Sequence, residues 1–197
     1  MSGFSEVMSL NGEVSFQLIR AGAAVEAAKA EAAPLLRALM NVRGRFMVEH
    51  VRDGQVIGQY AMPNGIVDVG LNSLLDVYFH NQAQITTWYI GLIDNAGFTA
   101  LSNSDTMGSH TGWAESTAYD EATREEWLEG AAASRSITNS TPAEFTISAT
   151  TTLKGIFVTS NNTKGGTTGT LWATAAFSST VGVQDNDILR ITYTVTG

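Results

Sequence analysis

The C-terminal third of the chain consists of short apolar runs separated by turn-forming residues. β-Branched and aromatic side chains are concentrated at 145–147, 156–158, 171–177 and 188–195. Clusters of Asn, Asp, Gly, Ser, Thr and Pro lie between these runs, and such residues favour tight turns. Short strands at this spacing are typical of antiparallel sheets. We therefore predict a mainly β protein, organised as an antiparallel β-sandwich.

Further strands are predicted upstream of this region. Residues 46–52 alternate in character, and Asp53-Gly54 is a strong two-residue hairpin signal, so 55–60 is expected to return as the paired strand. A dense aromatic and β-branched run at 86–93 indicates a buried strand. The polar, Gly- and Ser-rich stretch at 94–112 predicts a long loop, and such loops are often binding or interface elements.

The clearest helical pattern lies at about 66–80. Its apolar residues recur at three- and four-residue intervals and form one stripe: Val67, Leu71, Leu74, Leu75 and Tyr78. Asp68, Asn72 and Asp76 occupy the solvent-facing side, and Asn64 is placed to cap the first turn. We expect one amphipathic helix that packs on the sheet.

Residues 1–43 are predicted to form a separate, partly helical N-terminal arm, and residues 44–197 to form the β-sandwich body. Ala, Glu, Lys and Leu dominate 22–41 and favour helix, although Pro34 would kink it or start a second segment. A short apolar stripe follows: Leu35, Leu36, Leu39 and Met40. An Ala-rich helix offers little volume for a core of its own, so we expect it to pack against the body or against a neighbouring subunit.

The net charge of −8 is unevenly distributed. Residues 1–54 carry six basic and six acidic side chains, whereas 55–197 carry five basic and thirteen acidic ones, and 5 − 13 = −8. This acidity argues against a nucleic-acid partner. Either a solvated acidic surface or complementarity to a basic partner explains it. No apolar run approaches the length of a membrane span, so no membrane partner is expected.

Residues that could carry chemistry are few. The chain has no Cys, and His50, His80 and His110 share no metal-ligand spacing. The nucleophile-elbow pattern of serine hydrolases is absent. Acidic clusters at 120–129 and 185–187 could hold a cation, but a solvated loop and a turn are the simpler interpretation. We expect no catalytic residue, no metal and no cofactor, and hence a protein that is not an enzyme.

Large apolar side chains are the better candidates for function. Trp88 and Trp172 lie within apolar runs and are expected in the core, whereas Trp113 and Trp127 have polar neighbours and are candidates for a surface role. The predicted interface residues come from the arm and from the long loop region, where aromatic and aliphatic anchors would contribute most of the binding energy. They are Leu35, Leu36, Leu39, Met40, Trp113, Tyr119 and Trp127.

Six segments together carry a resemblance to a known family. They are 48–54 (VEHVRDG), 70–76 (GLNSLLD), 88–95 (WYIGLIDN), 143–147 (AEFTI), 153–160 (LKGIFVTS) and 169–175 (GTLWATA). Over about residues 44–197 the chain resembles small virion structural proteins of tailed bacteriophages, and the arm is not part of the likeness. The resemblance implies a non-enzymatic protein present in many copies within the virion, which is assembled in the host cytoplasm.

The resemblance favours a capsid decoration or cement protein that stabilises the head lattice through non-covalent contacts. Its expected partners are the major capsid protein or other virion proteins, and copies of itself as a homo-oligomer. A collar, tail or fibre component of the virion is the alternative. A carbohydrate-binding adhesin that uses exposed Trp residues is a third hypothesis, from a different class.

Overall fold

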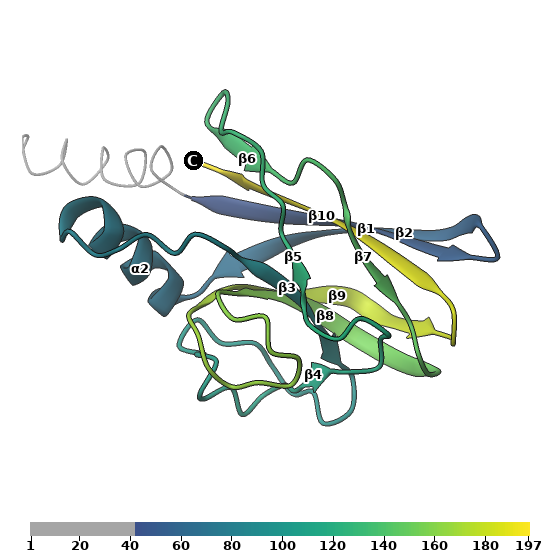
Figure 1. The fold of residues 1–197 in the computed structure, drawn as a ribbon. Coiled ribbons are helices and arrows are strands. Elements are labelled where there is room, and N and C mark those ends of the chain that lie inside the picture. Colours follow the sequence, from purple (N-terminus) through teal and green to yellow (C-terminus); the bar gives the residue numbers. More distant parts are fainter. Residues whose placement is uncertain (1–41) are drawn as a thin grey trace, which may run out of the picture. The chain divides into compact units, whose positions relative to one another are not determined.

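The computed structural model describes residues 42–197, and its elements are shown in Figure 1. The arm residues Leu35, Leu36, Leu39 and Met40 lie outside the described residues. The strands are β1 (Arg43–Arg52), β2 (Gln55–Ile66), β3 (Tyr89–Asp94), β4 (Glu115–Ser116), β5 (Glu125–Glu126), β6 (Ser136–Thr138), β7 (Ala143–Thr146), β8 (Thr151–Thr159), β9 (Leu171–Val183) and β10 (Ile188–Thr196). The helix is α2 (Asp68–Phe79).

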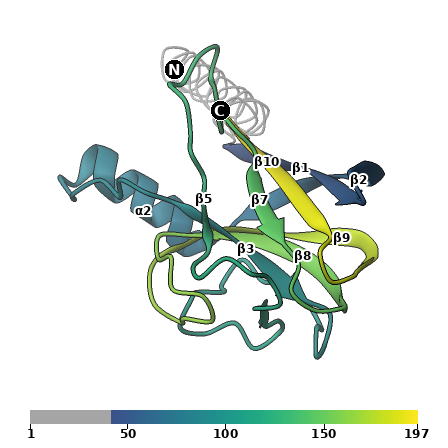
Figure 2. The same cartoon turned by 45° about the vertical axis from the view of Figure 1, so that its right-hand side comes forward.

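All strand pairs are antiparallel, which confirms the prediction of a mainly β class with one helix in the described region. The order is β4-β3-β8-β9-β2-β1-β10-β6, with β5 beside β3 and β7 beside β10. Strand β2 connects the strands β4-β3-β8-β9 to the strands β1-β10-β6. It pairs with β1 along its length, and its last residues Gly65 and Ile66 pair with β9. The result is a single hydrogen-bonded sheet that curls, as Figures 1 and 2 show.

The hairpin predicted at Asp53-Gly54 is confirmed. Strand β1 ends at Arg52 and β2 begins at Gln55. Asp53 and Gly54 have φ values of 50° and 73°, and the two-residue turns that match strand twist require positive φ at both positions.

The main core lies inside the curl. It is built from inward-facing residues of both ends of the sheet, including Phe46 of β1, Ile90 of β3, Ile156 of β8 and Tyr193 of β10. A smaller cluster around Trp113 and Phe157 lies beneath the long loop of residues 94–112, a loop that the sequence predicts correctly. Two cores of different size therefore share the sheet.

Helix α2 is confirmed in place, but not in the way it packs. Gly70 is its one buried residue, and a Cβ there would lie 2.6 Å from the Trp172 carbonyl oxygen. The helix thus approaches β9 through a glycine. Within the predicted stripe, Val67 is buried, whereas Leu71, Leu74, Leu75 and Tyr78 are 37% to 79% exposed. The cap prediction is wrong: Val67 is the N-cap without a side-chain bond, and the Asn64 amide donates to the Tyr193 hydroxyl instead (3.1 Å).

Candidate functional site

The exposed side of α2 carries five large apolar residues. Their exposed fractions range from 37% to 79%: Leu71, Leu74, Leu75, Tyr78 and Phe79. Because they fall at intervals of three and four, they lie on one side of the helix, and we call this set the α2 face. Isolated exposed apolar residues are ordinary, but a contiguous set on one helix is typical of a contact surface.

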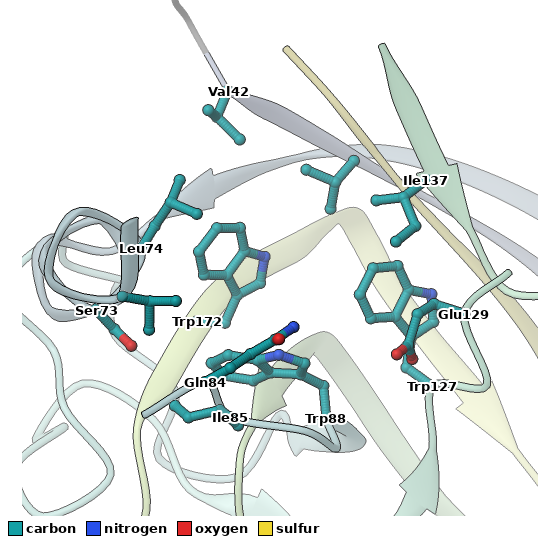
Figure 3. A pocket seen from close by; sticks show the side chains of 12 residues that line it. Val42, Ser73, Leu74, Gln84, Ile85, Trp88, Trp127, Glu129, Ile137 and Trp172 are labelled. Atoms are coloured by element: carbon teal, nitrogen blue, oxygen red, sulfur yellow. The ribbon is translucent and has the colours of Figure 1, made fainter. Parts of the chain in front are cut away.

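A pocket of about 270 Å³ opens beside the α2 face. Figure 3 shows three indole rings around it, Trp88, Trp127 and Trp172, and we call it the tryptophan pocket. Leu74 belongs both to the α2 face and to the pocket wall. The other lining residues are Val42, Ser73, Val77, Gln84, Ile85, Glu129, Ile137 and Val195.

Tyr193 fixes two of the three indoles. The Trp172 Nε1–H donates to the Tyr193 hydroxyl (2.8 Å), and the Trp127 Nε1–H donates to the Tyr193 carbonyl oxygen (3.0 Å). The Trp88 and Trp172 ring centroids are 5.7 Å apart. Burial raises the pKa of Tyr193, so its hydroxyl stays protonated. The N–H groups of these two indoles are therefore hydrogen-bonded within the protein, and their rings line the pocket.

The electrostatics of this region are simple. Among the described residues that line the tryptophan pocket, Glu129 is the sole charged one. No Lys or Arg occurs in the 71 residues between Arg52 and Arg124, a range that includes α2. The site therefore combines an apolar surface with an acidic border.

The structure corrects the expected exposure of three predicted interface residues. Trp113, Tyr119 and Trp127 are only 1% to 5% exposed. The Trp113 Nε1–H donates to Asp105 Oδ2 (2.9 Å), and the His110 ring stacks on the indole at 3.9 Å. Nearby residues in sequence supply the hydrogen-bond partners of Trp113 and Tyr119, whereas Trp127 donates to Tyr193, far along the chain. Polar neighbours in sequence therefore did not mean a surface position.

The remaining tryptophans depart from prediction in the opposite sense. Trp88 and Trp172, expected in the core, are only partly buried and pack against its edge, where they line the pocket. Trp127 contributes to both, since it is buried yet reaches the pocket wall. The polar stretch at 81–84 (NQAQ), shortly before Trp88, was the available sequence signal that this run begins at the border of the sheet.

No protein-family model matches the chain. The search of curated proteins also gave no match.

Within residues 42–197, no group of three or more His, Cys, Asp or Glu is arranged to hold a metal ion. The same residues contain no helix that is both long enough and apolar enough to cross a membrane.

Arg124, within the acidic segment 120–129, forms a buried ion pair with Glu115. The Arg124 guanidinium donates to both Glu115 oxygens (2.9 and 2.7 Å) and to the carbonyl oxygens of Asn161 and Gly166 (2.7 and 2.6 Å). It lies 5.1 Å from the Phe157 ring centroid. Each donor group is therefore used, and the pair ties the loop of 160–170 to the segment around Glu115.

A second ion pair joins β1 to the turn before β10. Asp187 accepts hydrogen bonds from Arg52 Nε at Oδ1 and from the Gln184 backbone N–H at Oδ2 (both 2.7 Å), and His50 Nε2 lies 2.7 Å from Asp187 Oδ2. The hydrogen bond from Arg52 is the main cause of a lowered pKa of Asp187, and it outweighs the opposing effect of burial. Arg52, His50 and the Gln184 N–H thus engage the Asp187 carboxylate, which a cation at the predicted turn of 185–187 would need as a ligand.

Proposed function

We propose that the protein is a structural component of a tailed-bacteriophage virion, and specifically a capsid decoration or cement protein. It acts by contact with neighbouring proteins and not by catalysis, without cofactor or metal. The sequence resemblance supports the virion setting. The single observation that carries the contact role is the α2 face, with five large apolar side chains exposed on one helix.

Burial of the α2 face against a neighbouring protein would make association more favourable. Burial of apolar surface contributes roughly 25 cal/mol per Å², and exposed aromatic side chains such as Tyr78 and Phe79 add large areas. A lattice repeats this contact at every copy, and a ligand that binds only the folded, assembled state stabilises it by mass action. The pattern is that of a cement, which adds stability to a junction without chemistry.

The other parts of the chain have roles in this proposal. The curled sheet would act as the β-sandwich body, and residues 1–43 as a partly helical arm that docks on a neighbour through Leu35, Leu36, Leu39 and Met40. The acidic body would face solvent or a basic surface of the major capsid protein. Copies would associate as a homo-oligomer.

The test compares the same substitution at two exposed leucines. Leu75→Asp places a carboxylate in the α2 face, whereas Leu128→Asp places it at a leucine outside α2 that is 49% exposed. We expect Leu75→Asp to lower co-sedimentation of the full-length protein with capsids about tenfold or more, and Leu128→Asp to leave it unchanged. Equal co-sedimentation of the two variants would reject the α2 face as the contact.

A collar, tail or fibre position in the same virion is the alternative. The α2 face is compatible with it, and the number of copies per particle separates the two: a decoration protein follows the capsid lattice, whereas a collar or tail protein forms a small ring or spike. The adhesin hypothesis depended on exposed Trp113 and Trp127, and their burial removes that basis.

A further inference from the structure

The tryptophan pocket has walls suited to a positive charge. The π-face of an aromatic ring carries negative potential, and Trp binds cations most strongly among the aromatic residues. Three indoles line this pocket, and Glu129 adds a carboxylate. Among the described residues that line the pocket, none is Lys or Arg, so no cationic side chain of this part of the wall repels a bound cation.

The hydrogen bonds of the indoles narrow the choice of ligand. The Nε1–H groups of Trp127 and Trp172 are both used by Tyr193. The other side-chain donors in the described lining are those of Ser73, Gln84 and Trp88, through which a sugar or an anion would have to bind. A quaternary ammonium group needs no donor, because it has no N–H and interacts through charge and methyl contacts.

The shape of the pocket suits a small group. In Figure 3, Trp88 and Trp172 lie on one side, and Trp127 with Glu129 lies across from them. The volume of about 270 Å³ is slightly below the usual range for drug-sized ligands, roughly 300–1,000 Å³. Aliphatic side chains such as Leu74 and Ile85 complete the wall and would contact alkyl substituents.

We propose that the tryptophan pocket binds small quaternary ammonium compounds, with the cation against the rings of Trp88, Trp127 and Trp172 and beside the Glu129 carboxylate. The proposed virion role does not depend on this pocket, because the contact with neighbouring virion proteins is proposed for the α2 face.

The experiment uses the full-length protein and two probes of the same shape. Choline and 3,3-dimethyl-1-butanol differ in that a neutral carbon replaces the charged nitrogen. In calorimetric titrations at constant ionic strength, we expect choline to bind about tenfold more tightly than the alcohol, the ratio that a partly desolvated cation–π contact produces. Equal affinities would show an apolar pocket without cation preference and overturn the proposal. Absence of choline binding would overturn it as well.

Two variants separate the local carboxylate from the overall negative charge. Glu129→Gln is expected to weaken choline binding several-fold and leave the alcohol unaffected. The control is Glu126→Gln, which removes an exposed carboxylate three positions away that does not line the pocket. An equal loss in both variants would contradict the proposal, since it would reflect net charge alone.

The aromatic contribution is tested by Trp88→Leu, which we expect to abolish the preference for choline over the alcohol. Near-ultraviolet circular dichroism checks that this variant is folded. If a folded Trp88→Leu protein kept the full preference for choline, the proposed contact of the cation with the indole rings would be overturned. If this variant does not fold, the comparison of Glu129→Gln with Glu126→Gln still tests the proposal.

Discussion

Beneath the loop of residues 94–112, the polar groups of Trp113 and Arg124 are bonded within the chain, whereas beside α2 large apolar side chains face solvent. In the first region, which we call the loop core, these polar groups are bonded to residues near in sequence, such as Asp105, and to the loop of 160–170. The second, which comprises the α2 face and the tryptophan pocket, is left open. The side chains of the loop core therefore contribute to the stability of the fold, whereas the α2 face and the tryptophan pocket leave apolar surface exposed for contacts.

The largest effect on stability is expected in the loop core. Arg124→Met leaves the buried Glu115 carboxylate without its partner, and breaking a buried pair costs about 3–5 kcal/mol. The matched control is Arg190→Met, which removes the same guanidinium from the half-exposed pair with Glu144 and is expected to cost about 0–1 kcal/mol. Urea denaturation gives both free energies of unfolding. Similar losses would show that the loop core is not specially stabilised.

A smaller difference is expected between two tryptophans. Trp113→Phe removes one of two hydrogen bonds to Asp105 Oδ2, the other coming from the Ser102 N–H, and a hydrogen bond to a charged group contributes about 1.5–3 kcal/mol. Trp88→Phe, which changes a partly buried side chain at the edge of the main core, is expected to cost about 1 kcal/mol. Thermal unfolding of the two variants measures the contrast. A more destabilising change at Trp88 would reverse our assignment of the two regions.

The ion pair of Asp187 makes stability depend on acid. The folded-state pKa of Asp187 is lowered, chiefly by Arg52, below the unfolded value of about 3.9. The stabilisation is therefore present above about pH 4 and is lost as the pH falls through the folded pKa. Asp187→Asn is expected to cost about 1–3 kcal/mol at neutral pH and to flatten the decline of stability below pH 4. An unchanged decline in denaturation series would assign it to other carboxylates.

The smallest effect on stability is expected at the α2 face. Leu75→Asp replaces an exposed side chain that contacts solvent, so the free energy of unfolding of the isolated protein should change by about 0.5 kcal/mol or less. Chemical denaturation of the unassembled protein provides the value. A loss comparable to that of Arg124→Met would mean that Leu75 is covered within the folded chain.

The strands, the hairpin and the helix could be predicted because each depends on local pattern. Asp53-Gly54 defines its turn by backbone preference alone, and the helical spacing of residues 66–80 holds in any surroundings. These signals were enough to identify a mainly β fold with one helix.

The candidate site could not be predicted, because burial depends on which distant residues cover a side chain. The α2 stripe is exposed because Gly70 meets the backbone of Trp172, a contact about a hundred residues apart in sequence. Trp113 is buried because Asp105 and His110 fold onto it. In both cases the sequence predicted the opposite: the apolar stripe was expected to pack on the sheet, and Trp113, with its polar neighbours, was expected at the surface.

The most direct test of the α2 face as a contact surface is oxidative footprinting of Tyr78, which is 79% exposed in the described chain. Labelling is compared between the free protein and the assembled particle, and the buried Tyr193 reports whether the fold stays intact. We expect Tyr78 to be labelled in the free protein and protected in the particle, while Tyr193 stays unlabelled in both. Equal labelling of Tyr78 in the two states would contradict the proposed contact.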